Sequence, residues 1–585
     1  MDCIGEICFF ALNPNGTKIF GFSEYISALA LIVLAWTTVD YRYRLHVQTS
    51  AINVRLLAFY GVGCIGLLTL ATDLWRASGW FVPEIGIVTP ELWQAILGIA
   101  FLAVFLTWTS IAFLKPPTFN SRNATRFIDI IYREVKQGDQ SQIAQMADAM
   151  ARSASSIVQM SYQFSKHRAD PSQAEKYEPG HQALELIADP RICNVIVTRA
   201  PALLDSLFQE LKTSPHNSRG TYTLARNVLN AAIMEEASFL HHEVANWQHG
   251  PAAASQPITS RIFGNIRLLD EIPGVFSLGS TLHWKATHWQ AYLRAAGQAI
   301  HGYVGEVEQG MLRPSTTIVN IFNELRDAPA ALGTSRKSGL ESDAEFALVL
   351  SELVRFVKEV ATRLGSSKVA PVRWNALDHH YNPVQLIAEL SYKILLASSY
   401  VRSSANTAWH FQKHIAWSGI FESLRSEPHH TYILENRELV ARMIWMSVRE
   451  LDYSPNYVGA QMLGLCVNVG LVRDKRWVPA SDKVSAQEAL ARLVTYWTRR
   501  RFASLYRYHP SLAVVGFAEG INYNKRKRLI SKEQEINAFR AKPEFILFQV
   551  DAAPPGKSED HVLGTRPPPF SPPKNRRKMQ DRPWF

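Results

Sequence analysis

Residues 92–114 read LWQAILGIAFLAVFLTWTSIAFL, an apolar stretch that contains no charged side chain. An α-helix needs about 20 mainly apolar residues to cross the hydrocarbon core of a bilayer. This stretch therefore predicts a transmembrane helix, and the charges on either side of it decide how the rest of the chain is placed.

Two further apolar runs precede it. Residues 56–72 read LLAFYGVGCIGLLTLAT and are flanked by Arg55 and Arg76, and residues 25–39 read YISALALIVLAWTTV, with Glu24 at their start. We expect both runs to cross the membrane as well. Residues 21–115 then form a three-helix transmembrane domain, which follows a short extracytoplasmic tail of residues 1–20.

The second run contains GVGCIG at residues 61–66, a literal GxGxxG. A dinucleotide site requires a strand before this motif and a helix that begins at it, whereas here the motif lies inside an apolar run. Glycines in membrane helices usually allow neighbouring helices to approach closely. The motif therefore indicates helix packing.

The basic residues predict the orientation of the crossings. Lys and Arg are concentrated after the first run and after the third run, at Arg42, Arg44, Arg55, Lys115, Arg122, Arg126 and Arg133. Cytoplasmic loops carry the excess of such residues. We therefore expect a multi-pass protein of the cell (inner) membrane, with the N-terminus outside and the C-terminal region cytoplasmic. Cys3 and Cys8 would lie outside, where they either form a disulfide or remain two unpaired thiols.

The rest of the chain favours helices. Of the 585 residues 47% are hydrophobic and 19% are charged, and apolar positions recur at helical spacing through most of residues 116–550. No repeat of fixed length is present. The predicted fold class is all-α: three N-terminal transmembrane helices are followed by a large irregular helical cytoplasmic region, residues 116–325 and 346–550, and by a disordered, basic, Pro-rich tail, residues 551–585. Stretches rich in Pro, Gly, Ser and Asp predict breaks at 167–181, 249–260, 326–345 and 367–383.

Residues 235–249, EEASFLHHEVANWQH, suggest a metal site at first sight. On a helix, however, His242 and His249 are separated by about 10.5 Å along the axis, too far to share one ion. Asn246 also stands where the HExxH motif of zinc hydrolases requires a histidine. We interpret the stretch as the polar side of a helix, on which Glu236 is half-buried and has a partner.

A better-spaced histidine pair occurs in WHFQKHIAW, residues 409–417. His410 and His414 are four residues apart, which places both rings on one face of a helix, as zinc ligation requires. A third ligand could come from Asp378, His379 and His380 or from Glu427, His429 and His430. The alternative is a pair of structural histidines at a packing interface.

Other catalytic templates are missing from the sequence. It contains no GxxxxGK[ST] phosphate loop, no GxSxG elbow, no kinase motif pair, no EF-hand loop and no CxxC pair. No cofactor is therefore predicted beyond a divalent metal at the histidine pair.

Two basic clusters are the remaining signal. TRRRFASLYRYH (498–509) carries Arg499, Arg500, Arg501 and Arg507, and NYNKRKRLISK (522–532) carries Lys525, Arg526, Lys527 and Arg528. Such clusters attract phosphates. Three interpretations stay open: a solvated basic face, contact with anionic lipid headgroups of the inner leaflet, and binding of nucleic acid, for which the interleaved aromatic residues would supply stacking surfaces.

These observations favour a membrane-anchored sensor, scaffold or effector that is not an enzyme and that works through protein contacts of its helical region or Pro-rich tail at the inner membrane face. The alternatives are a metal-dependent hydrolase built on His410 and His414, and binding of anionic lipid or nucleic acid through residues 499–532.

Overall fold

The computed structural model describes most of the chain. The residues described are 2–4, 7–11, 18–38, 40–51, 53–83, 89–114, 116–213, 219–243, 258–272, 274–277, 279, 284–309, 314–337, 343–366, 383–402, 404–422, 431–472, 485–534 and 544–552. The fold is mainly helical, as predicted, with two small antiparallel sheets. The chain divides into two compact units, residues 1–239 and 240–585, while the domain boundary predicted at 326–345 stays a prediction. The predicted tail lies almost wholly outside the described residues.

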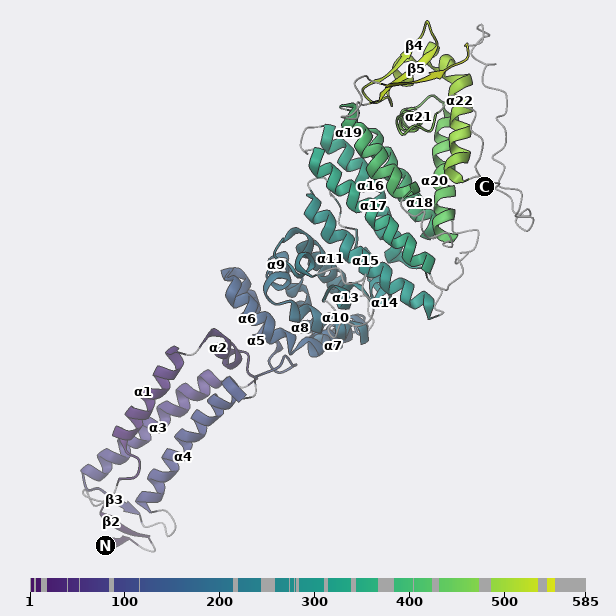
Figure 1. The fold of residues 1–585 in the computed structure, drawn as a ribbon. Helices are drawn as coiled ribbons and strands as arrows, with labels where there is room; N and C mark the ends of the chain where they lie inside the picture. The colour runs from purple at the N-terminus through teal and green to yellow at the C-terminus, as the bar shows by residue number, and fades with distance from the viewer. Residues whose placement is uncertain are drawn as a thin grey trace. The chain divides into compact units, whose positions relative to one another are not determined.

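The first unit begins with apolar helices. They are α1 (Phe22–Thr38), α3 (Val54–Ala77) and α4 (Pro90–Thr109), which continues into the π-helical turn η1 (Ser110–Leu114). Figure 1 shows α1, α3 and α4 side by side, and α3 packs against both of the others. The starts of α3 and α4 follow from capping, because the side chains of Asn53 and Thr89 accept hydrogen bonds from backbone amides in the first turn.

Two of these helices meet the requirements for crossing a membrane. Leu56–Ala77 and Pro90–Leu114 are long and apolar enough, whereas the apolar part of α1, Phe22–Leu34, is shorter. The structure thus gives two clear candidates where the sequence predicted three.

The glycine motif lies inside α3, in agreement with the packing interpretation. Tyr25 of α1 donates a hydrogen bond from its hydroxyl to the carbonyl of Val62 at 3.0 Å. A Cβ atom added at Gly66 would lie 2.5 Å from the Tyr25 ring, whereas one added at Gly63 would meet nothing within 4 Å. Gly66 is therefore the glycine that allows α1 to approach α3.

A short sheet joins the two strands before α1 to a strand between α3 and α4. Its strands are β1 (Asp2–Ile4), β2 (Ile7–Ala11) and β3 (Phe81–Pro83), in the order β1-β2-β3. In the antiparallel register Cys3 pairs directly with Cys8. These two residues are therefore opposite each other on adjacent strands.

The remainder of the first unit is a helical domain. Its helices are α2 (Tyr41–Gln48), α5 (Ala124–Gln137), α6 (Gln140–Ala151), α7 (Ala154–Lys166), α8 (Pro171–Ile187), α9 (Pro190–Arg199), α10 (Pro201–Thr213) and α11 (Arg219–Met234). The break predicted at 167–181 was wrong, since α8 covers most of it. Asp170 caps this helix and Pro171 takes its first position, a pairing that Asp189 and Pro190 repeat at α9.

The second unit contains longer helices and the second sheet. The helices are α13 (Ile258–Phe263), α14 (Ile266–Glu271), α15 (Ala286–Glu308), α16 (Thr316–Lys337), α17 (Asp343–Ser366), α18 (Pro383–Ser399), α19 (Ala405–Trp409), the π-helix η4 (His410–Glu422), α20 (Thr431–Glu450), α21 (Tyr457–Asn468), α22 (Ala486–Tyr508) and α23 (Pro510–Ala513). The strands are β4 (Ile521–Asn524), β5 (Leu529–Gln534) and β6 (Glu544–Gln549), in the order β4-β5-β6. Trp289, Tyr292, Phe346 and Trp417 are among the largest side chains of its core.

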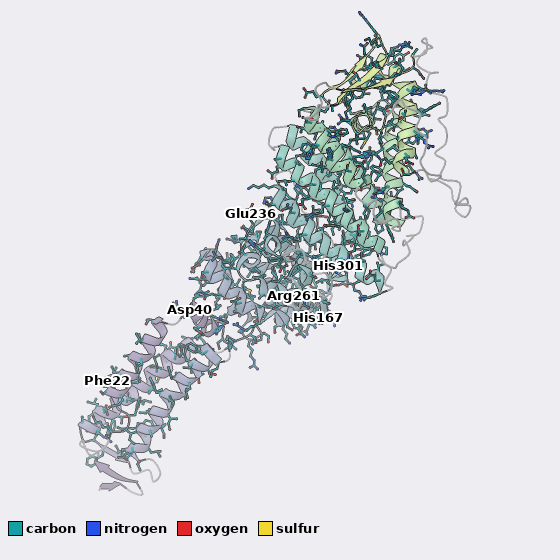
Figure 2. All side chains as sticks on the ribbon, in the orientation of Figure 1. Phe22, Asp40, His167, Glu236, Arg261 and His301 are labelled. Carbon is teal, nitrogen blue, oxygen red and sulfur yellow. The ribbon has the colours of Figure 1, made fainter. Side chains whose placement is uncertain are left out.

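The stretch 235–249 is not one helix. The short helix α12 (Phe239–His242) follows α11 after a turn, where the Ser238 hydroxyl donates to the Ala232 carbonyl. Glu236 lies in this turn and is exposed, so the expectation that it is half-buried was wrong (Figure 2). Glu243 has a capping role instead, because its carboxylate accepts the amides of Ile258 and Thr259 at 2.8 and 2.9 Å.

Candidate functional site

The first basic cluster lies on the C-terminal half of α22. This helix begins with a capping box, in which the side chains of Ser485 and Glu488 each accept the other's backbone amide. The sequence that follows alternates basic residues with buried aromatic ones. Its arginines therefore point to different surroundings, and they do not form one continuous basic face.

Arg501 is engaged inside the protein. Its Nε lies 3.9 Å from an oxygen of the Asp452 carboxylate, which also accepts a hydrogen bond from the Trp497 indole at 3.0 Å. Burial raises the pKa of Asp452, and the Arg501 charge opposes this rise. Arg501 therefore holds α22 against the connection between α20 and α21.

Arg499 and Arg500 lie nearer to solvent. The Arg499 guanidinium is 5.6 Å from the centre of the Phe548 ring of β6, and that of Arg500 is 4.8 Å from the Tyr496 ring. Such cation–π contacts hold the two arginine side chains in place. Arg507 is exposed in the last turn of α22.

The second basic cluster is a hairpin turn, which the sequence did not indicate. Asn524 of β4 pairs with Leu529 of β5, so Lys525, Arg526, Lys527 and Arg528 form the connection, and all four are exposed. The Asn524 side chain accepts the Lys527 amide at 3.0 Å, and Arg528 adopts a left-handed conformation with φ 51°. Four consecutive cations thus project from a defined turn.

Backbone hydrogen bonds join the two clusters. The Val550 amide donates to the Arg528 carbonyl at 2.9 Å, and the next amide, that of Asp551, donates to the Arg499 carbonyl at 2.8 Å. Because successive residues are about 3.8 Å apart, the two carbonyl oxygens lie within about 10 Å of each other. Arg499, Arg500 and Lys525–Arg528 therefore belong to one region, which we call the basic surface. Figure 1 shows β4 and β5 beside the end of α22.

Two of the three aromatic residues interleaved with the arginines pack inward, whereas Tyr508 in the last turn of α22 is exposed. Phe502 is fully buried, and its ring centre lies 4.9 Å from that of Tyr523 on β4. Tyr506 is partly buried and contacts the same Tyr523 ring at 4.8 Å. These contacts fix the hairpin on α22. They also occupy two of the three rings that the sequence offered as stacking surfaces for bases.

The histidine pair lies on η4, with both residues exposed. The ring centres of His410 and His414 are 6.2 Å apart. The Trp409 indole donates to Nε2 of His414 at 3.0 Å, so the lone pair of Nε2 is already engaged and Nδ1 carries the proton of the neutral ring. Both groups suggested as sources of a third ligand, 378–380 and 427–430, lie outside the described residues, and among the residues described no three His, Cys, Asp or Glu side chains are placed to hold a metal. The metal site stays a prediction.

A lysine from β5 changes the electrostatics beside this pair. The Lys532 ammonium lies 3.9 Å from the centre of the Trp409 ring and donates to the Asn468 carbonyl. Burial and the nearby Lys413 lower the pKa of Lys532 to about 8. Its positive charge, close to the indole that contacts His414, opposes binding of a metal cation there.

The structure also reveals a polar junction at the end of α4. His46 of α2 is buried, and its Nδ1 lies 3.0 Å from the Ala112 carbonyl in η1, while Arg152 lies 3.0 Å from its Nε2. Because a guanidinium can only donate, Nε2 carries no proton and Nδ1–H donates to Ala112. In a second contact, Nδ2 of the Asn123 side chain donates to the Thr49 carbonyl at 2.8 Å. Residues 41–50 thus connect the apolar helices to α5 and α6.

In comparisons with known proteins, no family model matches the chain, and neither a curated protein nor a solved structure does.

Proposed function

We propose that this chain is a membrane-anchored protein that is not an enzyme and that works through contacts of its helical region with other molecules, as a sensor, scaffold or effector. Its anchor is formed by α3 and α4, with α1 as a third crossing. The N-terminus lies outside the cell membrane and the region after α4 lies in the cytoplasm.

The exposure of the apolar helices carries this proposal. In the most apolar 18-residue window of α3, and in that of α4 with η1, only 22% of the residues are buried. A core helix of a water-soluble protein would have most of such a window covered. Leu31, Phe59, Leu67 and Ile99 are instead each more than 60% exposed. An apolar surface of this kind is expected to contact lipid.

Two observations favour contact over catalysis. The sequence holds no catalytic template, and the exposed histidine pair has the Lys532 cation nearby. The contacts that the structure offers outside the apolar helices include the basic surface, whose four hairpin cations are exposed. Binding of an anionic molecule there is the second function that a specific observation supports, namely the convergence of two clusters separated in the sequence.

Topology mapping tests the anchor. Reporter fusions at residues 48, 83 and 130 should report inside, outside and inside, and an epitope placed before Met1 should be reached from outside. An epitope reached only from inside would reduce the crossings to α3 and α4. Release of the chain from membranes by alkaline carbonate would refute the anchor itself.

A further inference from the structure

The basic surface has six cations and little opposing charge. Within the described part of the chain, no carboxylate pairs with Lys525, Arg526 or Lys527, and all three are exposed. Asp551 is the acidic residue placed at the edge of the surface by its backbone bond to Arg499. A solvated basic face would satisfy the same charges.

The geometry here is fixed from three sides. Tyr523 packs on Phe502 and Tyr506. The Val550 amide donates to the Arg528 carbonyl, and the Gln549 side chain donates to the Lys527 carbonyl at 3.3 Å. The cations are thus presented at the tip of a hairpin on a supported backbone. Little backbone freedom remains to be lost when they bind an anionic surface.

Nucleic acid fits this surface less well than lipid does. Single-stranded nucleic acids combine a basic groove with aromatic rings on which bases stack. The rings of Phe502, Tyr506 and Tyr523 are packed against one another, and the Arg500 guanidinium lies over the ring of Tyr496. Tyr508 is then the one exposed Phe or Tyr ring of residues 498–509 on which a base could stack. What remains is mainly charge at a projecting tip, which suits a dense layer of headgroup phosphates and carboxylates.

We propose that the basic surface, Arg499, Arg500 and Lys525–Arg528, binds the anionic lipid headgroups of the membrane in which the chain is anchored. This inference rests on the proposed membrane anchor, because attachment of the chain to the bilayer raises the effective concentration of the surface at the headgroups. Each basic residue near an anionic membrane contributes about a fivefold gain in binding at low salt.

The test uses the full chain in lipid nanodiscs, with Lys525 and Lys527 as built-in reporters. Their acylation by sulfosuccinimidyl acetate is measured by mass spectrometry relative to the exposed Lys212. We expect discs that contain phosphatidylserine to slow the acylation of both hairpin lysines at least fivefold relative to discs of phosphatidylcholine alone. High salt should remove most of this protection, because it screens exposed charges.

Charge reversal distinguishes binding through the basic surface from a general effect of the net charge of the chain. The triple variant Arg500→Glu, Arg526→Glu and Arg528→Glu keeps both reporter lysines and should lose the protection. The control reverses three exposed cations elsewhere, Lys166→Glu, Arg168→Glu and Lys358→Glu, and should keep it. Equal acylation rates in the two kinds of disc, or equal protection in the two variants, would overturn the inference.

Two further outcomes are informative. If a short oligouridylate protects the hairpin lysines in neutral discs while phosphatidylserine does not, the surface binds nucleic acid and the lipid assignment is wrong. If the chain fails to enter discs at all, the proposed anchor is refuted. A chain that enters the discs with unprotected lysines refutes only the lipid contact.

Discussion

Replacing His46 by leucine should loosen the junction between the apolar helices and the helical domain. Leucine is apolar and of comparable size, but it lacks both ring nitrogens. The change leaves the Ala112 carbonyl without the Nδ1–H donor that lies 3.0 Å away and removes the acceptor for Arg152. Both losses occur at one place, where α2 meets η1 on one side and α6 on the other.

The two losses are unequal. Arg152 is exposed, so water can replace His46 as its acceptor at little cost. His46 and its contact to Ala112 are buried, and an unsatisfied buried acceptor costs about 1–3 kcal/mol. We therefore expect the opening of residues 41–50 to become easier by about 2 kcal/mol, which is roughly a 30-fold increase in the open population.

Amide hydrogen exchange of the full chain in detergent measures this opening. Exchange at residues 44–50 should accelerate about 30-fold in His46→Leu, while exchange in the core of α11 should not change. The matched control is Gln48→Leu, an exposed position on the same helix, which should exchange as the wild type does. Equal exchange rates in the two variants would refute the reasoning that His46 holds the junction.

Three further predictions follow from particular contacts. Burial lowers the pKa of His46, and the unfolded chain therefore binds a proton at this position first as pH falls. The junction should be most stable above pH about 6.5 and should lose stability below it, and hydrogen exchange should show this loss in the wild type but not in His46→Leu. Gly66→Val should destabilise the apolar helices by about 1–3 kcal/mol in detergent melting, because the new side chain overlaps the Tyr25 ring, whereas Gly63→Val should have no such effect. Purified protein should contain less than about 0.1 equivalent of zinc, iron or manganese if Lys532 excludes a metal from His410 and His414, and a stoichiometric metal lost in His410→Ala would contradict this.

The sequence predicted the helical class because the apolar periodicity is strong over long stretches. It also gave the correct interpretation of GVGCIG, since surrounding apolar residues exclude a strand-to-helix turn. It failed at 167–181, where the high Pro and polar content suggested a loop. The side chain of Asp170 there accepts the amides of the first turn and Pro171 already has a helical φ, so the same residues start a helix.

The basic surface shows why only part of the site could be predicted from the sequence. The charges of both clusters are evident in the sequence, but their meeting depends on Val550 and Asp551, which are separated from Arg528 by more than twenty positions. The hairpin also lacks the Asn-Gly or Asp-Gly signal of tight two-residue turns. The junction at His46 was missed for a similar reason. Its partners Ala112 and Arg152 are distant in the sequence, and neither belongs to a recognisable motif.

The interleaving of arginine and aromatic residues in TRRRFASLYRYH illustrates how one pattern supports two opposite functions. As a sequence it matches a nucleic-acid surface, in which charge and stacking face the same way. A helix turns residues 500 and 502 about 200° apart, so charge and rings can equally face opposite ways. Phe502 is buried against Tyr523 while Arg500 is exposed. The aromatic half of the pattern thus builds the support, and the basic half is left to act by charge, which is the reason to expect a headgroup layer there and not stacked bases.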